Sequence, residues 1–226
     1  MSAEPETSTA EHPLVPPRAG SALGLAELRL APGGHAALDG GDADTLLYAG
    51  AGSGLLSAGE AEHALAPGTA AFVAAGETAT VTARADGLTL VRATVGPDCD
   101  RHAALGSRAH TVGAETAEAG AATGSRSFRV LFGPENGCTR ATLFLGRIPP
   151  GRAPWHYHLY DEIVWVPHGP GRLHLGDGVE ELGPGTAFRL SPRELHIVEN
   201  AGEAPMTVLG LFTPAGSPSA AYVPAS

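Results

Sequence analysis

The sequence predicts an all-β protein made of two similar β-barrels in tandem. Two observations lead to this prediction. The 226 residues include 31 glycines and 19 prolines, which separate short apolar runs in the way that is typical of sandwiches and barrels. The chain also contains an internal repeat, because a shift of 117 residues places residues 65–70 (LAPGTA) on residues 182–187 (LGPGTA).

The same shift aligns turn and strand positions over much of the chain. The aligned pairs are Pro32 with Pro149, Gly34 with Gly151, Tyr48 with Trp165, and Gly52 with Gly169. Because turn glycines and strand apolar residues stay in register together, the repeat indicates two copies of one all-β unit. We expect Tyr48 and Trp165 to pack outside their barrels, with a subunit interface as one location to consider.

The repeat divides the chain into five parts. These are a flexible N-terminal arm at residues 1–21, a first barrel at 22–96, a linker at 97–126, a second barrel at 127–214, and a C-terminal tail at 215–226. The arm is polar and rich in proline, a composition that is typical of disorder. The tail is rich in Pro, Ala and Ser, and we expect no chemistry from it.

Eight short strands are predicted in the second barrel. They span residues 127–132, 139–148, 155–158, 162–167, 172–182 with a turn at 176–178, 186–190, 196–200, and 206–212. Closing such strands into a barrel removes exposed sheet edges and leaves an interior that can hold one small ligand.

Charge and hydropathy exclude several classes of function. The net charge is −10, and all 14 basic residues are arginine, so no basic stripe is present for a nucleic acid. A chain without lysine cannot form an internal Schiff base. The start of the chain has no apolar core, and no apolar run approaches the roughly 20 residues that span a bilayer. We therefore expect a cytoplasmic protein with no membrane or nucleic-acid partner.

One stretch carries residues of the metal-ligand type. His156 and His158 point to one face if the segment is a strand, because side chains alternate. Glu162 follows, and His196 could close the site. Imidazole and carboxylate groups suit Fe(II), Mn(II), Ni(II), Co(II), Zn(II) or Cu(II), and affinity order alone does not choose among them. The sequence therefore predicts one mononuclear site for a divalent transition metal.

These residues resemble the first motif of the cupins, and specifically of the two-barrel bicupins. That motif is a glycine, then His-x-His, a glutamate and a further glycine, here Gly151, His156, His158, Glu162 and Gly169. The chain departs from it in one respect, since four residues separate Gly151 from His156 where five are usual.

The second cupin motif follows in the expected register. Gly185, His196 and Asn200 match its glycine, histidine and asparagine, whereas Ser191 replaces its proline and Arg193 its glycine. These replacements affect the turn and leave the ligand unchanged. The resemblance covers both units and implies two tandem jelly-roll barrels of the cupin type, with His156, His158, Glu162 and His196 as metal ligands.

The first unit lacks such a set. The shift of 117 residues places Asp39, Gly41, Thr45 and Ala79 at the four ligand positions. We therefore expect the first barrel to be a structural partner that covers the second, contributes to a homodimer, or restricts the pocket.

Four other residues are candidates for contacting a substrate: Arg140, Phe144, Tyr160 and Arg189. A structural role is an equally open alternative for each. An inward arginine would favour an anionic substrate group, because guanidinium matches the geometry of a carboxylate.

The resemblance implies several reaction classes, since cupins include dioxygenases, isomerases, decarboxylases, cyclases and aminohydrolases. The leading hypothesis is a metal-dependent dioxygenase, an oxidoreductase that acts on a small organic molecule. One alternative is a non-redox isomerase, cyclase, lyase or hydrolase in which the metal acts as a Lewis acid. Another is a non-catalytic protein that binds a small molecule.

Overall fold

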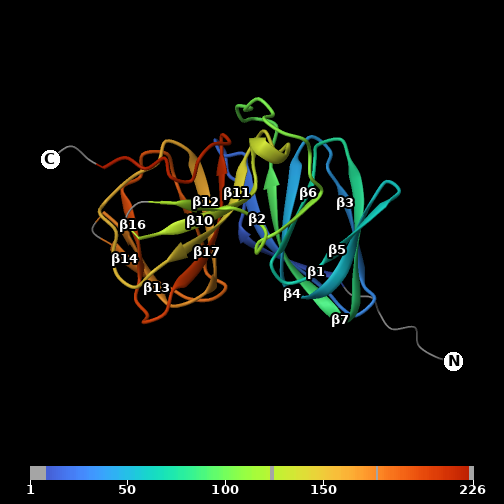
Figure 1. Cartoon of the computed structure of the whole chain (residues 1–226), viewed down its shortest axis with the longest axis horizontal. Helices are drawn as coiled ribbons and strands as arrows, with labels where there is room; N and C mark the ends of the chain where they lie inside the picture. Colours follow the sequence, from blue (N-terminus) through green and yellow to red (C-terminus); the bar gives the residue numbers. More distant parts are fainter. Residues whose placement is uncertain (1–8, 123–124, 177, 224–226) are drawn as a thin grey trace.

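The chain folds into two β-barrels that lie side by side (Figure 1). The computed structural model describes residues 9–122, 125–176 and 178–223. Apart from a short 3-10 turn at Pro134–Asn136, the regular structure of these residues is strand. This confirms the predicted all-β fold with two barrels in tandem.

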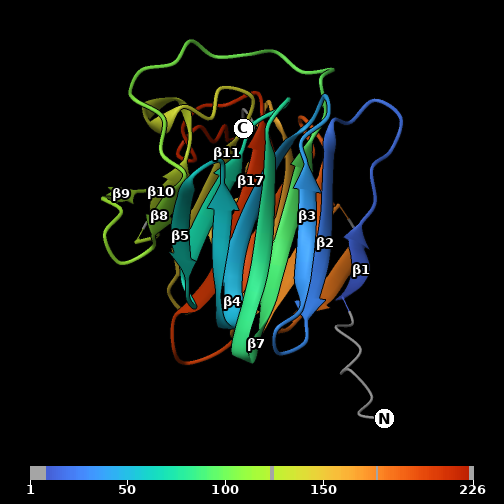
Figure 2. The same ribbon diagram turned by 90° about the vertical axis from the view of Figure 1, so that its right-hand side faces the viewer.

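The first barrel is built from one large antiparallel sheet that curls around an apolar interior. Its strands are β1 (Thr9–Val15), β2 (Leu23–Leu30), β3 (His35–Asp39), β4 (Asp44–Ala58), β5 (Ala61–Leu65), β6 (Thr69–Val73), β7 (Thr78–Val95) and β8 (Thr111–Gly113). The long strand β7 pairs with β2 at one end and with β3 at the other (Figure 2). Aliphatic side chains such as Leu47, Leu56 and Val81 fill the interior.

The second barrel has two antiparallel sheets facing each other. Its strands are β9 (Ala119–Ala121), β10 (Ser127–Phe132), β11 (Thr142–Ile148), β12 (Asp161–His168), β13 (Gly171–Leu175), β14 (Gly178–Leu182), β15 (Ala187–Leu190), β16 (His196–Asn200) and β17 (Met206–Thr213). One sheet has the order β15-β12-β17-β11-β10-β9, and the other has the order β14-β13-β16. Strands β10 and β16 have the predicted bounds.

Two repeat glycines are explained by close backbone contacts. Gly52 and Gly169 both have positive φ, at 74° and 99°. A Cβ atom on Gly52 would lie 2.2 Å from the carbonyl oxygen of Gly87, and one on Gly169 would lie 3.0 Å from the Cα atom of Met206. The repeat therefore preserves glycine where the same bend occurs in each barrel.

The two barrels share one apolar cluster, which contains residues of both. Tyr48 and Trp165, the aligned aromatic pair, contact each other edge to face with ring centroids 6.4 Å apart. Phe72 and Phe132 add a second contact, with centroids 5.6 Å apart. Tyr48 and Trp165 thus pack outside their own barrels as expected, but the interface lies between the barrels of one chain.

The prediction of a flexible arm is wrong for residues 9–15, which form β1 and pair with β2. The exposed, polar residues of β1 suggested disorder because this strand lies at a sheet edge, where Pro13 is tolerated beside a shift in register. The 117-residue shift places β1 on residues 126–132, which overlap β10, so the repeat includes it. Residues 1–8 lie outside the described part of the chain.

The predicted linker and the strand predicted at 155–158 also differ from the structure. Within the linker, β8 pairs with β6 and β9 pairs with β10, so both barrels gain an edge strand. Residues 155–158 form only isolated bridges, from His156 to His196 and from Tyr157 to Tyr222. Pro154 precedes this segment and supplies no backbone N–H group for a longer ladder. Among the described residues, no helix has the length and apolar character needed to cross a membrane.

Candidate metal centre

Four buried side chains of the metal-ligand type meet inside the second barrel. His156 and His158 lie between β11 and β12, Glu162 is in β12, and His196 begins β16. Reciprocal backbone hydrogen bonds of 3.2 and 2.9 Å join His156 to His196. The four residues are only 2% to 8% exposed. Residues that are distant in sequence are thus brought to one point by the closure of the barrel.

The three imidazoles converge. One ring nitrogen of each lies within 4.8 Å of the others, and the ring centroids of His156 and His196 are 4.5 Å apart. Two ligand atoms bound at about 2.1 Å to one ion are at most about 4.2 Å apart. Small side-chain rotations would therefore bring all three nitrogens onto one ion.

Backbone carbonyl groups orient each imidazole. The Nδ1 atoms lie 3.0 Å from Pro154 O for His156, 3.0 Å from Ala220 O for His158, and 2.8 Å from Glu194 O for His196. A carbonyl oxygen can only accept, so Nδ1 carries the proton and the Nε2 lone pair is left for a ligand bond.

Burial keeps the imidazoles in the neutral form that binds metals. Burial lowers the pKa of His158 to about 4 and the pKa of His196 to about 3. It also lowers the pKa of His156. At neutral pH the three side chains therefore carry no charge that would repel a cation.

Glu162 completes the set. Its Oε2 atom lies 3.7 Å from Nε2 of His158. Burial raises the pKa of this carboxyl group to about 8, and the neighbouring charge of Asp161 adds to the effect. A cation at the imidazole cluster would stabilise the ionised form. A buried carboxylate beside three neutral imidazoles is thus a donor set that fits a divalent transition metal.

A cavity of about 100 Å³ opens onto these four side chains. Much of its lining is apolar, with Val164, Leu190 and Val208 among the contributing residues. Phe144 and Tyr160, which were expected to contact a substrate, also line it. The Tyr160 ring stacks on Phe212 with centroids 4.0 Å apart. The cavity has room for several water-sized groups, enough for a small molecule.

The structure contradicts the expectation for Arg140, which lies between the barrels. Its guanidinium pairs with the Asp44 carboxylate of the first barrel at 3.3 Å and donates to Asp42 O at 2.7 Å. Arg140 falls within the strand predicted at residues 139–148, which would put it on one face with Phe144, but β11 begins only at Thr142. The alternation therefore does not extend back to Arg140.

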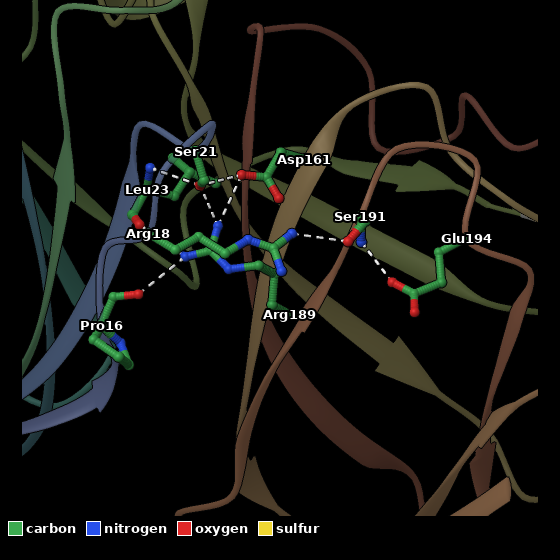
Figure 3. Close-up of polar contacts among 8 residues, drawn as sticks. All are labelled: Pro16, Arg18, Ser21, Leu23, Asp161, Arg189, Ser191 and Glu194. Atoms are coloured by element: carbon green, nitrogen blue, oxygen red, sulfur yellow. Dashed lines mark hydrogen bonds and ion pairs between the residues drawn. The ribbon is translucent and has the colours of Figure 1, made fainter.

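The expectation for Arg189 is also wrong, because this residue is not among those that line the cavity and its side chain points toward Ser21 and Asp161 (Figure 3). Its Nη1 atom donates to Asp161 at 2.8 Å and also to Ser21, and Nη2 donates to Leu23 O at 2.9 Å. Phe188 and Leu190 pack in the interior of the second barrel. Alternation therefore directs Arg189 toward the first barrel.

The N-terminal segment also contacts the loop that leads to His196 (Figure 3). Arg18 donates to Ser191 Oγ at 2.8 Å, and the backbone N–H of Ser191 donates to the Glu194 carboxylate at 2.7 Å. Since Glu194 O is the partner of His196 Nδ1, the N-terminal segment supports the position of this ligand through a chain of contacts.

The sequence analysis did not predict two parts of the cavity lining. The tail, from which no chemistry was expected, contributes Pro218 and Ala221 to the lining and Ala220 O to His158. Arg126 also lines the cavity. Alternation from Phe128, another lining residue at the start of β10, would have found it. Nothing in the composition of the tail indicated its position.

Comparison with known proteins agrees with this geometry. Residues 144–212 match the family model described as "Cupin domain". A search of curated proteins gives no significant match.

Solved structures share the fold of the whole chain. A Bacillus subtilis oxalate decarboxylase, described with Mn(II) centres, matches with a TM-score of 0.72 and 13% identity over 88% of this chain and 70% of that one. A putative glyoxylate-induced protein from Pseudomonas aeruginosa has a TM-score of 0.76 and 15% identity over 90% and 79%. A cupin 2 conserved barrel domain protein from Leptotrichia buccalis has a TM-score of 0.66 and 14% identity over 94% and 92%.

At these identities the structural likeness concerns the fold alone, whereas the family match covers the segment that holds all four ligand-type residues. The family model thus shows that residues 144–212 are similar to a cupin domain, and the solved structures show that the fold extends over both barrels.

Proposed function

We propose that this protein is a metal-dependent enzyme that acts on a small organic molecule, with a dioxygenase reaction as the leading class. His156, His158, Glu162 and His196 would hold one divalent transition metal in the second barrel. The observation that carries the proposal is the convergence of three neutral imidazoles, each with its Nδ1 atom beside a carbonyl oxygen.

Several metals suit this donor set. Imidazole and carboxylate ligands accept Fe, Mn, Ni, Co, Zn or Cu. The Mn(II) centres of the Bacillus subtilis oxalate decarboxylase occur in a related fold, which makes manganese one candidate among these. The cavity beside these four side chains would leave room for a small molecule next to the bound ion.

When bound, a redox-active metal would supply electron exchange with dioxygen and an electrophilic centre for a chelating substrate. The protein side chains would exclude water and orient the substrate. Phe144, Val164 and Leu190 give the cavity an apolar wall, which strengthens electrostatic contacts inside it. Tyr160 would present its hydroxyl group as a hydrogen-bond donor, because burial raises its pKa.

The lining limits which side chains could transfer protons. Apart from the four ligand residues, the ionisable groups among the described lining residues are Tyr160, Arg126 and Arg147. None of these is a carboxylate or imidazole that could serve as a general base near neutral pH. A reaction in this cavity would therefore depend on the metal, or on a water molecule that the metal activates, for its base.

A non-redox reaction is the second candidate, and Tyr160 favours it. This side chain lines the cavity and stacks on His158 with ring centroids 4.6 Å apart, so its hydroxyl group would be available as a hydrogen-bond donor to a substrate oxygen during isomerisation, cyclisation or elimination. A third candidate is a binding protein without catalysis, in which the same residues only hold the metal and a ligand.

Metal analysis combined with oxygen consumption tests these alternatives. Protein purified without chelators is expected to contain about one equivalent of a transition metal, or to take it up on reconstitution. Each metal form is then offered small diketones, catechols, thiols and hydroxy acids in an oxygen electrode. Oxygen uptake that is lost in His196→Ala and retained in His168→Ala supports the dioxygenase.

Two results would decide against it. Metal-loaded protein that converts a substrate without oxygen uptake belongs to the non-redox class. Less than about a tenth of an equivalent of metal, with no gain on reconstitution, contradicts the enzyme proposal altogether.

A further inference from the structure

We propose that the cavity of the second barrel binds small organic acids, and that Arg126 holds their carboxylate group. This inference rests on the proposed function, because the rest of the acid would face the cluster of His156, His158 and His196. It assigns a substrate class to the cavity and a specificity-determining role to a residue that precedes β10.

The position of Arg126 is the first argument. The residue lines the cavity together with the histidine cluster. One guanidinium nitrogen donates to the carbonyl oxygen of Val198, which follows His196 on β16. The head group is thus fixed against the strand that carries a ligand residue. A guanidinium has five N–H donors, so this single bond leaves several for a ligand.

The positive charge of Arg126 also favours the binding of an anion. Within the described part of the chain, no carboxylate forms an ion pair with Arg126, although Arg140 and Arg189, which are also partly or wholly buried, both have an aspartate partner. A partly buried cation without a counter-ion loses some of its hydration without compensation, and a bound anion would reduce that cost. Burial lowers the pKa of Arg126, and its positive charge adds to the main effect of burial on the pKa of His156.

The metal would increase the preference for an anion. A divalent ion held by three neutral imidazoles and the Glu162 carboxylate retains one positive charge, and Arg126 contributes another. An acid with a second oxygen donor would meet both, with its carboxylate on the guanidinium and its other donor toward the metal-binding side chains. Guanidinium and carboxylate match in geometry through two parallel hydrogen bonds.

The size of the cavity limits the acid. A volume of about 100 Å³ excludes bulky ligands, since drug-sized molecules need at least roughly 300 Å³. Phe128 and Phe144 contribute apolar surface to the lining, which suits a short hydrocarbon chain. The geometry thus points to hydroxy or oxo acids of few carbon atoms.

Arg147 is the competing cation. It also lines the cavity, but it is exposed to solvent. A carboxylate paired with Arg147 would remain hydrated, and an exposed ion pair contributes only about 0 to 1 kcal/mol. Arg126 is therefore expected to dominate the binding of an anion.

Calorimetric titration of the full chain tests the assignment. The probes are a panel of 2-hydroxy and 2-oxo acids with about two to five carbon atoms, each paired with its neutral amide. Titrations are made with metal-free protein and with protein loaded with Zn(II) or Mn(II), and the metal content is measured separately. At least one acid is expected to bind about tenfold more tightly than its amide.

Substitutions then show which residue causes the preference for an acid over its amide. Arg126→Met is expected to abolish this preference, and Arg126→Lys is expected to retain part of it. Arg129→Met is the matched control: Arg129 lies on β10, three residues after Arg126, it is not among the residues that line the cavity, and it donates to the carbonyl oxygens of Glu115 and Ala117. It should change the acid-to-amide ratio less than about twofold. Circular dichroism verifies that each variant is folded.

Three outcomes would overturn the assignment: equal binding of every acid and its amide, an unchanged preference in Arg126→Met, or a preference that is lost in Arg147→Met instead. The metal measurement keeps the two proposals apart. Protein that holds metal but does not discriminate contradicts only the role of Arg126. Protein that holds no metal, yet prefers acids in a manner that depends on Arg126, contradicts only the metal site.

Discussion

The ring of Tyr160 lies parallel to the imidazole of His158, with ring centroids 4.6 Å apart and an interplanar angle of 9°. Tyr160 in turn stacks on Phe212, which is fully buried. The His158 side chain is therefore fixed on one face by a packed aromatic ring and at Nδ1 by Ala220 O.

This stacking predicts an effect on metal affinity. Tyr160→Ala removes the ring and is expected to weaken metal binding about tenfold, because supports of ligand residues typically contribute this much. Tyr160→Phe keeps the ring and should bind the metal as the wild type does. Competition with a chromophoric chelator measures both. Equal affinity in all three proteins would contradict a positioning role for the ring.

The backbone conformation of Arg193 leads to a prediction about stability. It is the one non-glycine residue with positive φ, at 65°, in the described part of the chain, and it occupies the position where the second cupin motif has a glycine. Arg193→Gly should raise the free energy of unfolding by about 1 kcal/mol, because a left-handed conformation is unfavourable for residues with a Cβ atom. Urea unfolding of the metal-free protein measures this, and a lower stability would contradict it.

The buried pair of Arg140 and Asp44 predicts a large loss of stability without a loss of metal. Arg140→Met leaves the Asp44 carboxylate unpaired between the barrels and is expected to cost about 3 kcal/mol. The double variant Asp44→Asn/Arg140→Met should recover part of that, since it leaves no buried charge. Urea unfolding and metal content are compared. A selective loss of metal in a folded Arg140→Met variant would instead place Arg140 in the functional site.

Glu162 predicts a dependence of stability on pH in the metal-free protein. Its folded-state pKa is raised from 4.5 to about 8, so the protonated form is favoured by folding. That contribution is complete below the unfolded-state pKa and is lost as pH rises through about 8. The free energy of unfolding should therefore fall between pH 4.5 and about pH 8, and level off above that.

The control is Glu162→Gln, which does not titrate and should lose this part of the pH dependence. Stabilisation of the wild type by added metal should grow over the same range, since the ligand form is the carboxylate. Urea unfolding at several pH values with and without metal checks both statements. A pH profile that is identical in Glu162→Gln would contradict the assignment.

The fold was predictable because its signals are local or periodic. Gly52 and Gly169 lie at equivalent positions where a Cβ atom would come too close to the backbone of a neighbouring strand. Glycine is therefore present at both positions, which makes the repeat visible in the sequence. Strands such as β16 are flanked by turn-forming residues, so their ends could be recognised in the sequence. The convergence of His156, His158 and His196 could be predicted from the motif. The extended segment that contains His156 and His158 pairs with the start of β16, where His196 lies.

The substrate residues were less predictable, because a strand shifted by one residue presents its other face. Arg189 was misplaced for this reason, and Arg140 because it precedes its strand. Arg126 was overlooked although alternation from Phe128 indicates it. The carbonyl group of Ala220 enters the site through a contact between segments that are distant in sequence, and no local pattern records such a contact. The homodimer and the cytoplasmic location remain predictions.

X-ray absorption spectroscopy of the reconstituted protein, together with the His156→Ala and His196→Ala variants, tests the metal centre itself. We expect about one metal ion per chain, with three imidazole ligands and a carboxylate oxygen at roughly 2.0 to 2.2 Å. Each variant should lose an imidazole signal or the metal itself. A bound metal whose spectrum is unchanged in both variants would contradict a metal centre in the second barrel.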